Sequence, residues 1–183
     1  MQAFLRDPKN KGASVFIKPA VSAKAFSAII EPRDRMLDTV INGIPGVLNG
    51  LPRSTSVFCS EIVDMRSEYR VYVVNGVVRA ICKYRGSGEA LDMEVVKKAV
   101  DTLSRSVEGR DLTGYGMDFA VMKKKVSDGG VDEYITCLVE VNDGYSLGCY
   151  KGILAKDYTD LLIARWGTLV GKTKKSEANI MDY

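Results

Sequence analysis

The chain has 183 residues, of which 46% are hydrophobic and 27% charged, and its formal net charge is +3. This is the composition of a globular protein of one domain or two small lobes, and it excludes the disordered and fibrous classes. There is no histidine, so Ser-His and Cys-His nucleophile pairs are excluded, and any chemistry must use carboxylates, lysines, arginines and metal ions. No apolar run reaches the roughly 18 residues of a membrane span and the first residues lack a signal-peptide pattern, so we expect a cytoplasmic protein without a membrane partner.

The cysteines and the basic residues narrow the classes further. The four cysteines stand singly in apolar strands or a turn, without CxxC spacing, so we expect reduced thiols in the core instead of disulfides or a zinc site. The basic residues are dispersed apart from 123–125 and 172–175. They form no contiguous stripe, which argues against nucleic acid as a partner while leaving room for an anionic ligand.

The first predicted strand covers residues 13–20 and carries a single cation, Lys18, just before Pro19. The proline ends regular strand pairing. An ammonium held at a strand end suits a phosphate. A lysine whose stem packs along the strand while its charge stays in water fits the same pattern. Residues 34–48 then show helical spacing of apolar side chains, and we assign them to packing alone.

The clearest structural signal is a β-hairpin over residues 68–85. Asn75-Gly76 separates two runs of β-branched and aromatic residues, which is the strongest short hairpin pattern. Alternation predicts that one face of the first strand carries Glu68, Arg70, Tyr72 and Val74, and that one face of the second carries Ile81, Lys83 and Arg85. A solvated face with weak cross-strand ion pairs fits this arrangement as well.

Two helices are predicted in the second half of the chain. Asp92 is placed to cap a helix that runs to about Val107. Its predicted buried stripe consists of Val95, Val96, Ala99, Val100 and Leu103. Residues 155–166 predict a final amphipathic helix.

Two strands between these helices each carry an isolated acidic residue among apolar neighbours. Residues 115–122 contain Asp118, and after a predicted turn the chain returns through 133–142, where alternation places Glu140 and Asn142 on one face, about 7 Å apart. A buried carboxylate costs several kcal/mol unless it is paired or bound to metal, so these oxygens predict a hard cation such as Mg²⁺. A carboxylate satisfied at a strand end is the competing interpretation.

Taken in order, these motifs resemble the nucleotide site of the ATP-grasp superfamily over roughly residues 13–166. The motifs are Lys18, the segment 60–64, Glu68-x-Arg70 with its Asn-Gly turn, Asp118, and Glu140-x-Asn142. Residues 142–148 and the helix that follows resemble more particularly a compact clade of that family, many of whose members are phage-encoded, so the host cytoplasm is the expected location if the chain is of phage origin.

The resemblance implies an α+β fold of two lobes, each with an antiparallel sheet and packed helices, and with the nucleotide between the lobes. It places a lead-in at 1–12, the first lobe at 13–64, the second lobe with the metal site at 65–170, and a polar tail at 171–183. Members of the family usually carry a preceding N-terminal domain, whereas here the Ile-Lys-Pro strand is reached by Ile17. We therefore expect that domain to be missing or supplied by a partner chain.

The resemblance also implies roles for individual residues. Lys18 is expected to contact phosphates, residues 21–30 occupy the place of the phosphate-covering loop, and the segment 60–64 resembles the hinge whose backbone groups read adenine. The candidate nucleotide-binding residues are Lys18, Lys24, Glu61, Ile62, Val63, Asp64, Glu68 and Leu138, with Asp64 or Glu68 on the ribose. Arg70 and Arg85 match the anion-binding positions of the related hairpin, with Lys83 as a nearby variant. Asp118, Glu140 and Asn142 are the expected ligands of Mg²⁺, or of Mn²⁺.

The implied reaction is the ATP-dependent joining of a carboxylate to an amine or thiol through an acylphosphate, with a peptide or protein among the candidate substrates. The competing hypothesis is a nucleotide-binding module without ligase activity, which would serve as a regulatory or assembly partner. A phosphotransferase or a nucleic-acid end-modifying enzyme would share the metal site, but it should show the basic groove that this sequence lacks.

Overall fold

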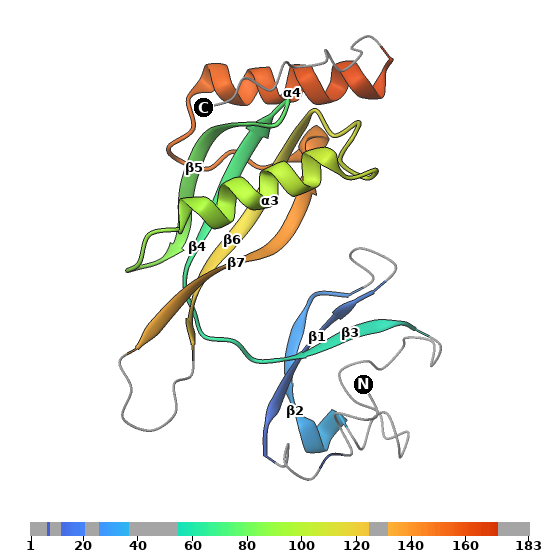
Figure 1. The fold of residues 1–183 in the computed structure, drawn as a ribbon. Coiled ribbons are helices and arrows are strands. Elements are labelled where there is room, and N and C mark those ends of the chain that lie inside the picture. The colour runs from blue at the N-terminus through green and yellow to red at the C-terminus, as the bar shows by residue number, and fades with distance from the viewer. Residues whose placement is uncertain (1–6, 8–11, 21–25, 37–54, 125–131, 172–183) are drawn as a thin grey trace. The chain divides into compact units, whose positions relative to one another are not determined.

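The computed structural model describes residues 7, 12–20, 26–36, 55–124 and 132–171. The chain divides into two compact units, Met1–Val63 and Asp64–Tyr183. Each unit contains an antiparallel sheet of its own, with strand order β2-β1-β3 in the first and β5-β4-β6-β7 in the second (Figure 1). Most of the helix predicted at 34–48 and the whole of the predicted tail beyond residue 171 lie outside the described residues, and the helical turn that is described covers residues 33–36.

The first unit is built on three strands: β1 (Ser14–Pro19), β2 (Ile29–Pro32) and β3 (Val57–Glu61). Val15 and Ile17 alternate onto one face of β1 and are fully buried together with Met36. The sequence pattern predicts a loop up to Ile30, and this is wrong for its last two residues, which pair with β1 as the start of β2. A strand of four residues is too short to show alternation in the sequence.

The second unit is a sheet of four longer strands. They are β4 (Met65–Val74), β5 (Val77–Gly86), β6 (Gly114–Lys124) and β7 (Glu133–Asp143). The predicted Asn-Gly turn between β4 and β5 is confirmed, because Asn75 and Gly76 both have positive φ, 52° and 78°. That conformation suits the right-handed twist of the strands and is open to asparagine and glycine at little cost.

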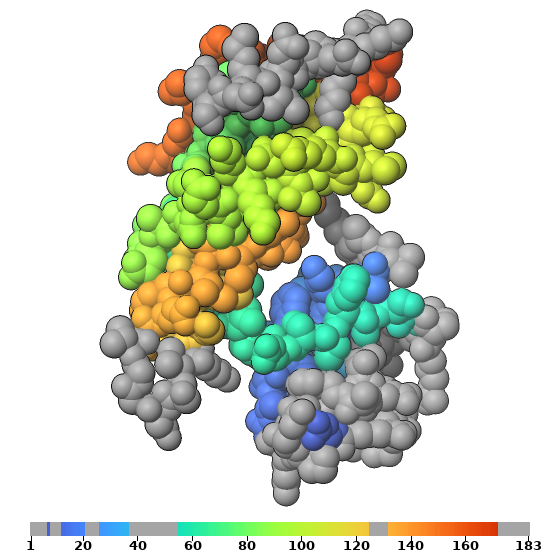
Figure 2. Space-filling view, viewed as in Figure 1, coloured from blue at the N-terminus to red at the C-terminus, as the bar shows by residue number. Residues whose placement is uncertain are grey.

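Helices cover both faces of this sheet (Figure 1). Helix α3 (Met93–Arg105) buries Val96 and Val100 against Val71 and Val73 of β4, together with Tyr115, Met117 and Phe119 of β6. Helix α4 (Ala155–Leu169) buries Leu161 on the other face, where its neighbours include Tyr72, Val74, Cys82 and Leu147. The 3₁₀ turn η2 (Gly144–Ser146) connects β7 to the loop before α4. In Figure 2, α3 and β7 lie side by side on the viewed face of the unit.

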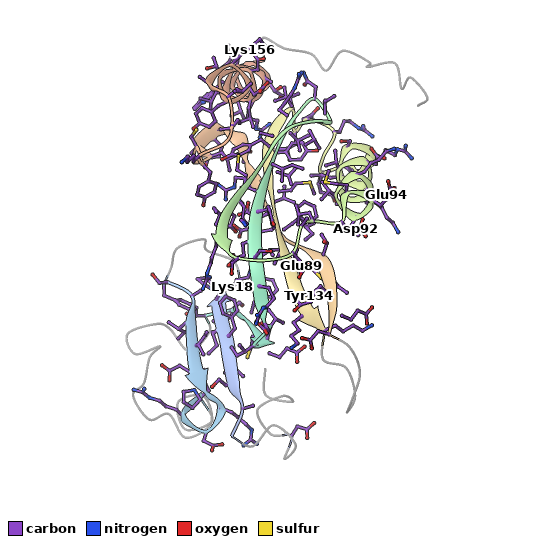
Figure 3. The ribbon with its side chains drawn as sticks, turned by 90° about the vertical axis from the view of Figure 1, so that its left-hand side faces the viewer. Lys18, Glu89, Asp92, Glu94, Tyr134 and Lys156 are labelled. Atoms are coloured by element: carbon purple, nitrogen blue, oxygen red, sulfur yellow. The ribbon has the colours of Figure 1, made fainter. Side chains whose placement is uncertain are left out.

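The predicted start of α3 is confirmed. Asp92 is the N-cap, and its carboxylate accepts the backbone N–H of Glu94 at 2.9 Å; Figure 3 labels both residues where the helix begins. The helix ends two residues earlier than predicted, at Arg105, because the backbone at Ser106 is extended and its N–H bonds back to the Leu103 carbonyl.

The thiols are free, as predicted, but they are not all in the core. Cys82 is buried, Cys59 and Cys137 are half-buried, and Cys149 is exposed in the loop that precedes α4. Burial raises the pKa of the Cys59 and Cys82 thiols, which keeps both protonated near neutral pH. No helix in the described part of the chain is long and apolar enough to cross a membrane.

Candidate functional site

Cross-strand pairing places the polar residues of three neighbouring strands on the same face of the second sheet. Arg70 of β4 lies opposite Asp118 of β6, which in turn lies opposite Glu140 of β7. Gly116 lies opposite Asn142 one pair along. Directly opposed residues share a face of an antiparallel sheet, so this polar row lies on the face that also packs against α4.

A buried ion pair is the centre of the row. Arg70 donates from Nε to Oδ1 of Asp118 and from Nη2 to Oδ2, each at 2.7 Å. The two side chains are only 10% and 4% exposed. The hydrogen bonds to Asp118 raise the pKa of Arg70 and outweigh burial, which acts in the opposite direction. Arg70 therefore stays a cation at any physiological pH, and it is held by the edge that contains Nε and Nη2.

Asn142 joins the two carboxylates. Its amide nitrogen donates to Glu140 Oε1 at 3.0 Å and to Asp118 Oδ2 at 3.3 Å. Alternation along β7 thus brings Glu140 and Asn142 together as the sequence predicts, and it places Asp118 beside them. Within the described residues, neither the Asn142 amide oxygen nor the second oxygen of Glu140 has a hydrogen-bond partner.

This donor set fits a hard cation. Two carboxylates and an amide oxygen converge from adjacent strands, and oxygen ligands of this kind are those that Mg²⁺ and Mn²⁺ prefer. The described residues contain no group of three or more His, Cys, Asp or Glu side chains of the kind that holds a metal by itself. A cation at this position would therefore depend on the asparagine as well, and on oxygens from its ligand.

The aromatic side chains around Arg70 were not predicted from the sequence as part of the site. The Arg70 guanidinium lies over the ring of Tyr150, with Cζ at 4.9 Å from the ring centroid. That ring stacks on Tyr84 at 4.7 Å with an interplanar angle of 15°. Gly116 leaves room for the arginine stem, because a Cβ there would lie 3.3 Å from Arg70 Cδ and 2.8 Å from Leu147 Cδ2.

Glu68 lies one alternation further along β4 and is already engaged. Its carboxylate accepts Arg85 Nη1 at 2.9 Å and the Tyr84 hydroxyl at 3.2 Å. Burial, reinforced by the charges of Asp118 and Glu68, raises the pKa of Tyr84, so its hydroxyl remains a donor. The Glu68 side chain is 13% exposed and that of Arg85 is 76% exposed.

A bulge corrects the predicted face of Lys83. The register pairs Glu68 with Arg85 but Tyr69 with Lys83, which leaves Tyr84 as the extra residue on β5. Because a bulge shifts the alternation by one residue, Arg85 joins the face of Glu68 and Arg70, whereas Lys83 faces the opposite side with Tyr69. The prediction that Lys83 and Arg85 share a face is therefore wrong.

Comparison with known families identifies the fold. The model of an ATP-grasp domain, the second family of its clade, matches residues 2–161. The chain belongs to this ATP-grasp family. The predicted α+β fold with two antiparallel sheets is thereby confirmed. A comparison with curated proteins found no match.

Two solved structures show the same ATP-grasp fold. One is the ATP-grasp ligase PsnB complexed with a phosphomimetic variant of a minimal precursor, Mg and ADP; it has a TM-score of 0.53 and 18% identity, and the match covers 90% of this chain and 50% of that chain. The other is PsnB complexed with the minimal precursor, with a TM-score of 0.52, 18% identity, and coverage of 90% and 52%. This chain therefore spans about half the length of the ligase it resembles.

In the first unit of this ATP-grasp chain, Lys18 is exposed near the end of β1, with its ammonium 5.7 Å from the centroid of the Phe58 ring (Figure 3). Glu61 ends β3, and Ile62 and Val63 are exposed just beyond it. These positions leave the predicted nucleotide roles open. Lys24 lies outside the described residues.

Two further candidates lie in the second ATP-grasp unit, at a distance in register from the polar row. Asp64 accepts Arg66 Nη1 at 3.3 Å in an exposed contact, so its carboxylate remains accessible. Leu138 is paired with Phe119, whose side chain packs toward α3, and it is 45% exposed. A bulge between the Glu140 and Leu138 pairs therefore separates Leu138 from the face of Glu140.

Sequence reasoning had one available signal for the residues that it missed. Tyr72 shares the predicted face of Arg70, and in the structure its hydroxyl donates to the Gly148 carbonyl and accepts the Tyr150 N–H, each at 2.9 Å. Tyr150 lies in an irregular loop with no periodicity, so the sequence contains no pattern that places its ring under Arg70.

Proposed function

We propose that this chain is an ATP-dependent ligase that joins a carboxylate to an amine or thiol, with a peptide or protein as the substrate. The observation that carries the proposal is the convergence of Arg70, Asp118, Glu140 and Asn142 on one face of the sheet in an ATP-grasp chain. The comparison structure holds Mg, ADP and a precursor variant, which supports a nucleotide, a divalent cation and a larger substrate.

Asp118, Glu140 and Asn142 are the residues that would hold Mg²⁺ or Mn²⁺. The cation would offset the negative charge of the ATP phosphates. Bidentate pairing with Arg70 does not exclude this role, because a carboxylate has about four lone-pair sites and Asp118 accepts three of the hydrogen bonds that the structure shows.

Arg70 is proposed to stabilise the charge that develops on the transferred phosphoryl group. Its Nε and Nη2 are bound to Asp118, which leaves the two protons of Nη1 for an anionic oxygen. The γ-phosphoryl group moves from ATP to a carboxylate oxygen and gives ADP and an acylphosphate. The amine or thiol then attacks the acyl carbon and inorganic phosphate leaves. Positioned cations supply most of the catalysis in such a transfer.

Other residues are proposed for binding. Glu68 or Asp64 would accept hydrogen bonds from the ribose hydroxyls, and Arg85, held by Glu68 at 2.9 Å, is placed to contact the substrate carboxylate. Lys18 and the backbone of residues 61–63 remain the candidates for phosphate and adenine. Lys83 has no role in this proposal, because it lies on the other face. A partner chain that completes the acceptor pocket is part of the proposal.

Nucleotide binding is tested by thermal unfolding with ATP and Mg²⁺ or Mn²⁺, and with EDTA as the control. A ligand present at about 100 times its Kd stabilises the folded state by about 2.7 kcal/mol. No shift with any nucleoside triphosphate and either cation would contradict the proposal. Ligase activity is tested by ADP release in mixtures of candidate carboxylates and amines. Binding without acceptor-dependent ADP release would favour the nucleotide-binding module instead.

A further inference from the structure

The guanidinium of Arg70 is confined by more contacts than ion pairing requires. Asp118 holds the edge that contains Nε and Nη2 at 2.7 Å, and the Tyr150 ring lies under Cζ at 4.9 Å. A Cβ at Gly148 would lie 3.9 Å from Nη1, so the loop backbone passes beside this nitrogen without a side chain there. Nη1 has no hydrogen-bond partner among the residues that the structure describes.

Tyr150 is itself fixed from two directions. Its ring stacks on Tyr84, whose hydroxyl donates to Glu68. Its backbone N–H donates to the hydroxyl of Tyr72, and the same hydroxyl donates to the Gly148 carbonyl. Tyr72 is fully buried in the core under α4, so the loop from Gly148 to Tyr150 is fastened to a rigid part of the sheet.

We propose that Tyr150 is a positioning residue that sets the plane of the Arg70 guanidinium and thereby directs Nη1 toward the substrate oxyanion. Two hydrogen bonds along one edge leave the guanidinium able to tilt about that edge, and an aromatic ring against its face opposes the tilt. This inference rests on the proposed function only in the identity of the oxyanion, a phosphoryl or acyl oxygen of the substrate.

The variants Tyr150→Phe and Tyr150→Leu separate the ring from the rest of the side chain. The Tyr150 hydroxyl has no partner in the described part of the chain, so phenylalanine should keep the ring contact, whereas leucine keeps volume and loses the aromatic face. A partly desolvated cation–π contact is worth about 1 to 2 kcal/mol, which predicts a fall in kcat of about 5- to 30-fold for Tyr150→Leu. The KM for ATP should change by less than about 2-fold, because the contact acts after binding.

The second readout needs no ligand and no activity. The Arg70 Nε–Hε group gives a ¹H–¹⁵N correlation that is assigned by its loss in Arg70→Lys. In Tyr150→Leu this signal should shift, and its hydrogen should exchange with water about 5- to 30-fold faster, in proportion to the lost contact. In Tyr150→Phe both the position of the signal and its exchange rate should match the wild type.

Tyr158→Phe is the matched control for loosening of the same loop. The Tyr158 hydroxyl donates to the Leu147 carbonyl at 2.6 Å, at the other end of the loop from Tyr150, and it does not touch Arg70. This variant should lose stability and leave the Arg70 signal in place. The inference is overturned if folded Tyr150→Leu keeps the wild-type Arg70 signal, if Tyr158→Phe moves that signal equally, or if the signal moves while kcat is retained. If the wild type consumes no ATP, the proposed function fails, and the Arg70 signal alone decides whether Tyr150 holds the arginine.

Discussion

Replacing Asp118 with asparagine should strongly destabilise the second unit in the absence of any ligand. The change leaves the Arg70 cation buried without its counter-ion, since the two side chains are 10% and 4% exposed. It also turns an amide NH₂ toward one of the two donors that Asp118 now accepts at 2.7 Å. Removing one partner of a buried pair costs about 3 to 5 kcal/mol. That is a large share of the roughly 5 to 15 kcal/mol that keeps a domain folded.

Urea unfolding followed by tryptophan fluorescence measures this cost in the correct unit. The single tryptophan of the chain, Trp166, lies in α4 of the second unit. With a slope of about 2 kcal/mol per M, the loss predicts that the Asp118→Asn midpoint falls by about 1.5 to 2.5 M. The slope itself should stay unchanged if the fold is retained.

Glu133→Gln provides the matched control, because it makes the same acid-to-amide change on the neighbouring strand. Glu133 accepts Lys124 Nζ at 2.8 Å, but both side chains are 54% exposed. An exposed pair contributes at most about 1 kcal/mol, so this midpoint should fall by less than about 0.5 M. Equal shifts for the two variants would refute the inference that the Arg70 and Asp118 pair is a buried structural contact.

Three further predictions concern nucleotide chemistry and acid stability. Glu140→Gln keeps the shape and the contact with the Asn142 amide but removes a charge, so ADP release should fall about 100- to 1000-fold while calorimetric ATP affinity changes much less; unchanged turnover would argue for a satisfied carboxylate at a strand end. Glu68→Ala should weaken ATP binding by about 1 to 3 kcal/mol if Glu68 accepts the ribose hydroxyls, and equal affinity would move that role to Asp64. Burial opposes ionisation of Asp143, but hydrogen bonds from Arg165, one of them 2.6 Å long, and from a backbone N–H outweigh it and lower the pKa of this carboxyl below its ordinary value. The stability that this adds is therefore complete above the unfolded-state pKa of about 3.9 and is lost as the pH falls through the lower folded-state pKa, so the difference in unfolding free energy between wild type and Asp143→Asn should shrink over that window, and a difference that stays constant there would contradict the assignment.

The sequence by itself determined the features that depend on neighbours along the chain. The Asn75-Gly76 turn needs only two residues that tolerate positive φ, and both adopt it. The cap at Asp92 bonds a backbone group two residues away. Glu140 and Asn142 meet because alternation over two residues of one strand leaves them no other face. Each of these outcomes is local, so its physical cause can be read in a short stretch of sequence.

The tertiary structure decided what depends on pairing between distant strands. Arg70 and Asp118 are 48 residues apart, and the Tyr72 hydroxyl meets the Tyr150 N–H across 78 residues. The bulge at Tyr84 moved Arg85 to the face of Glu68 and Lys83 away from it. Alternation predicts faces only while the register is unbroken, and a bulge is set by how two strands pack together. For that reason the acidic and amide residues of the site could be proposed from sequence, whereas the aromatic support of its arginine could be seen only in the fold.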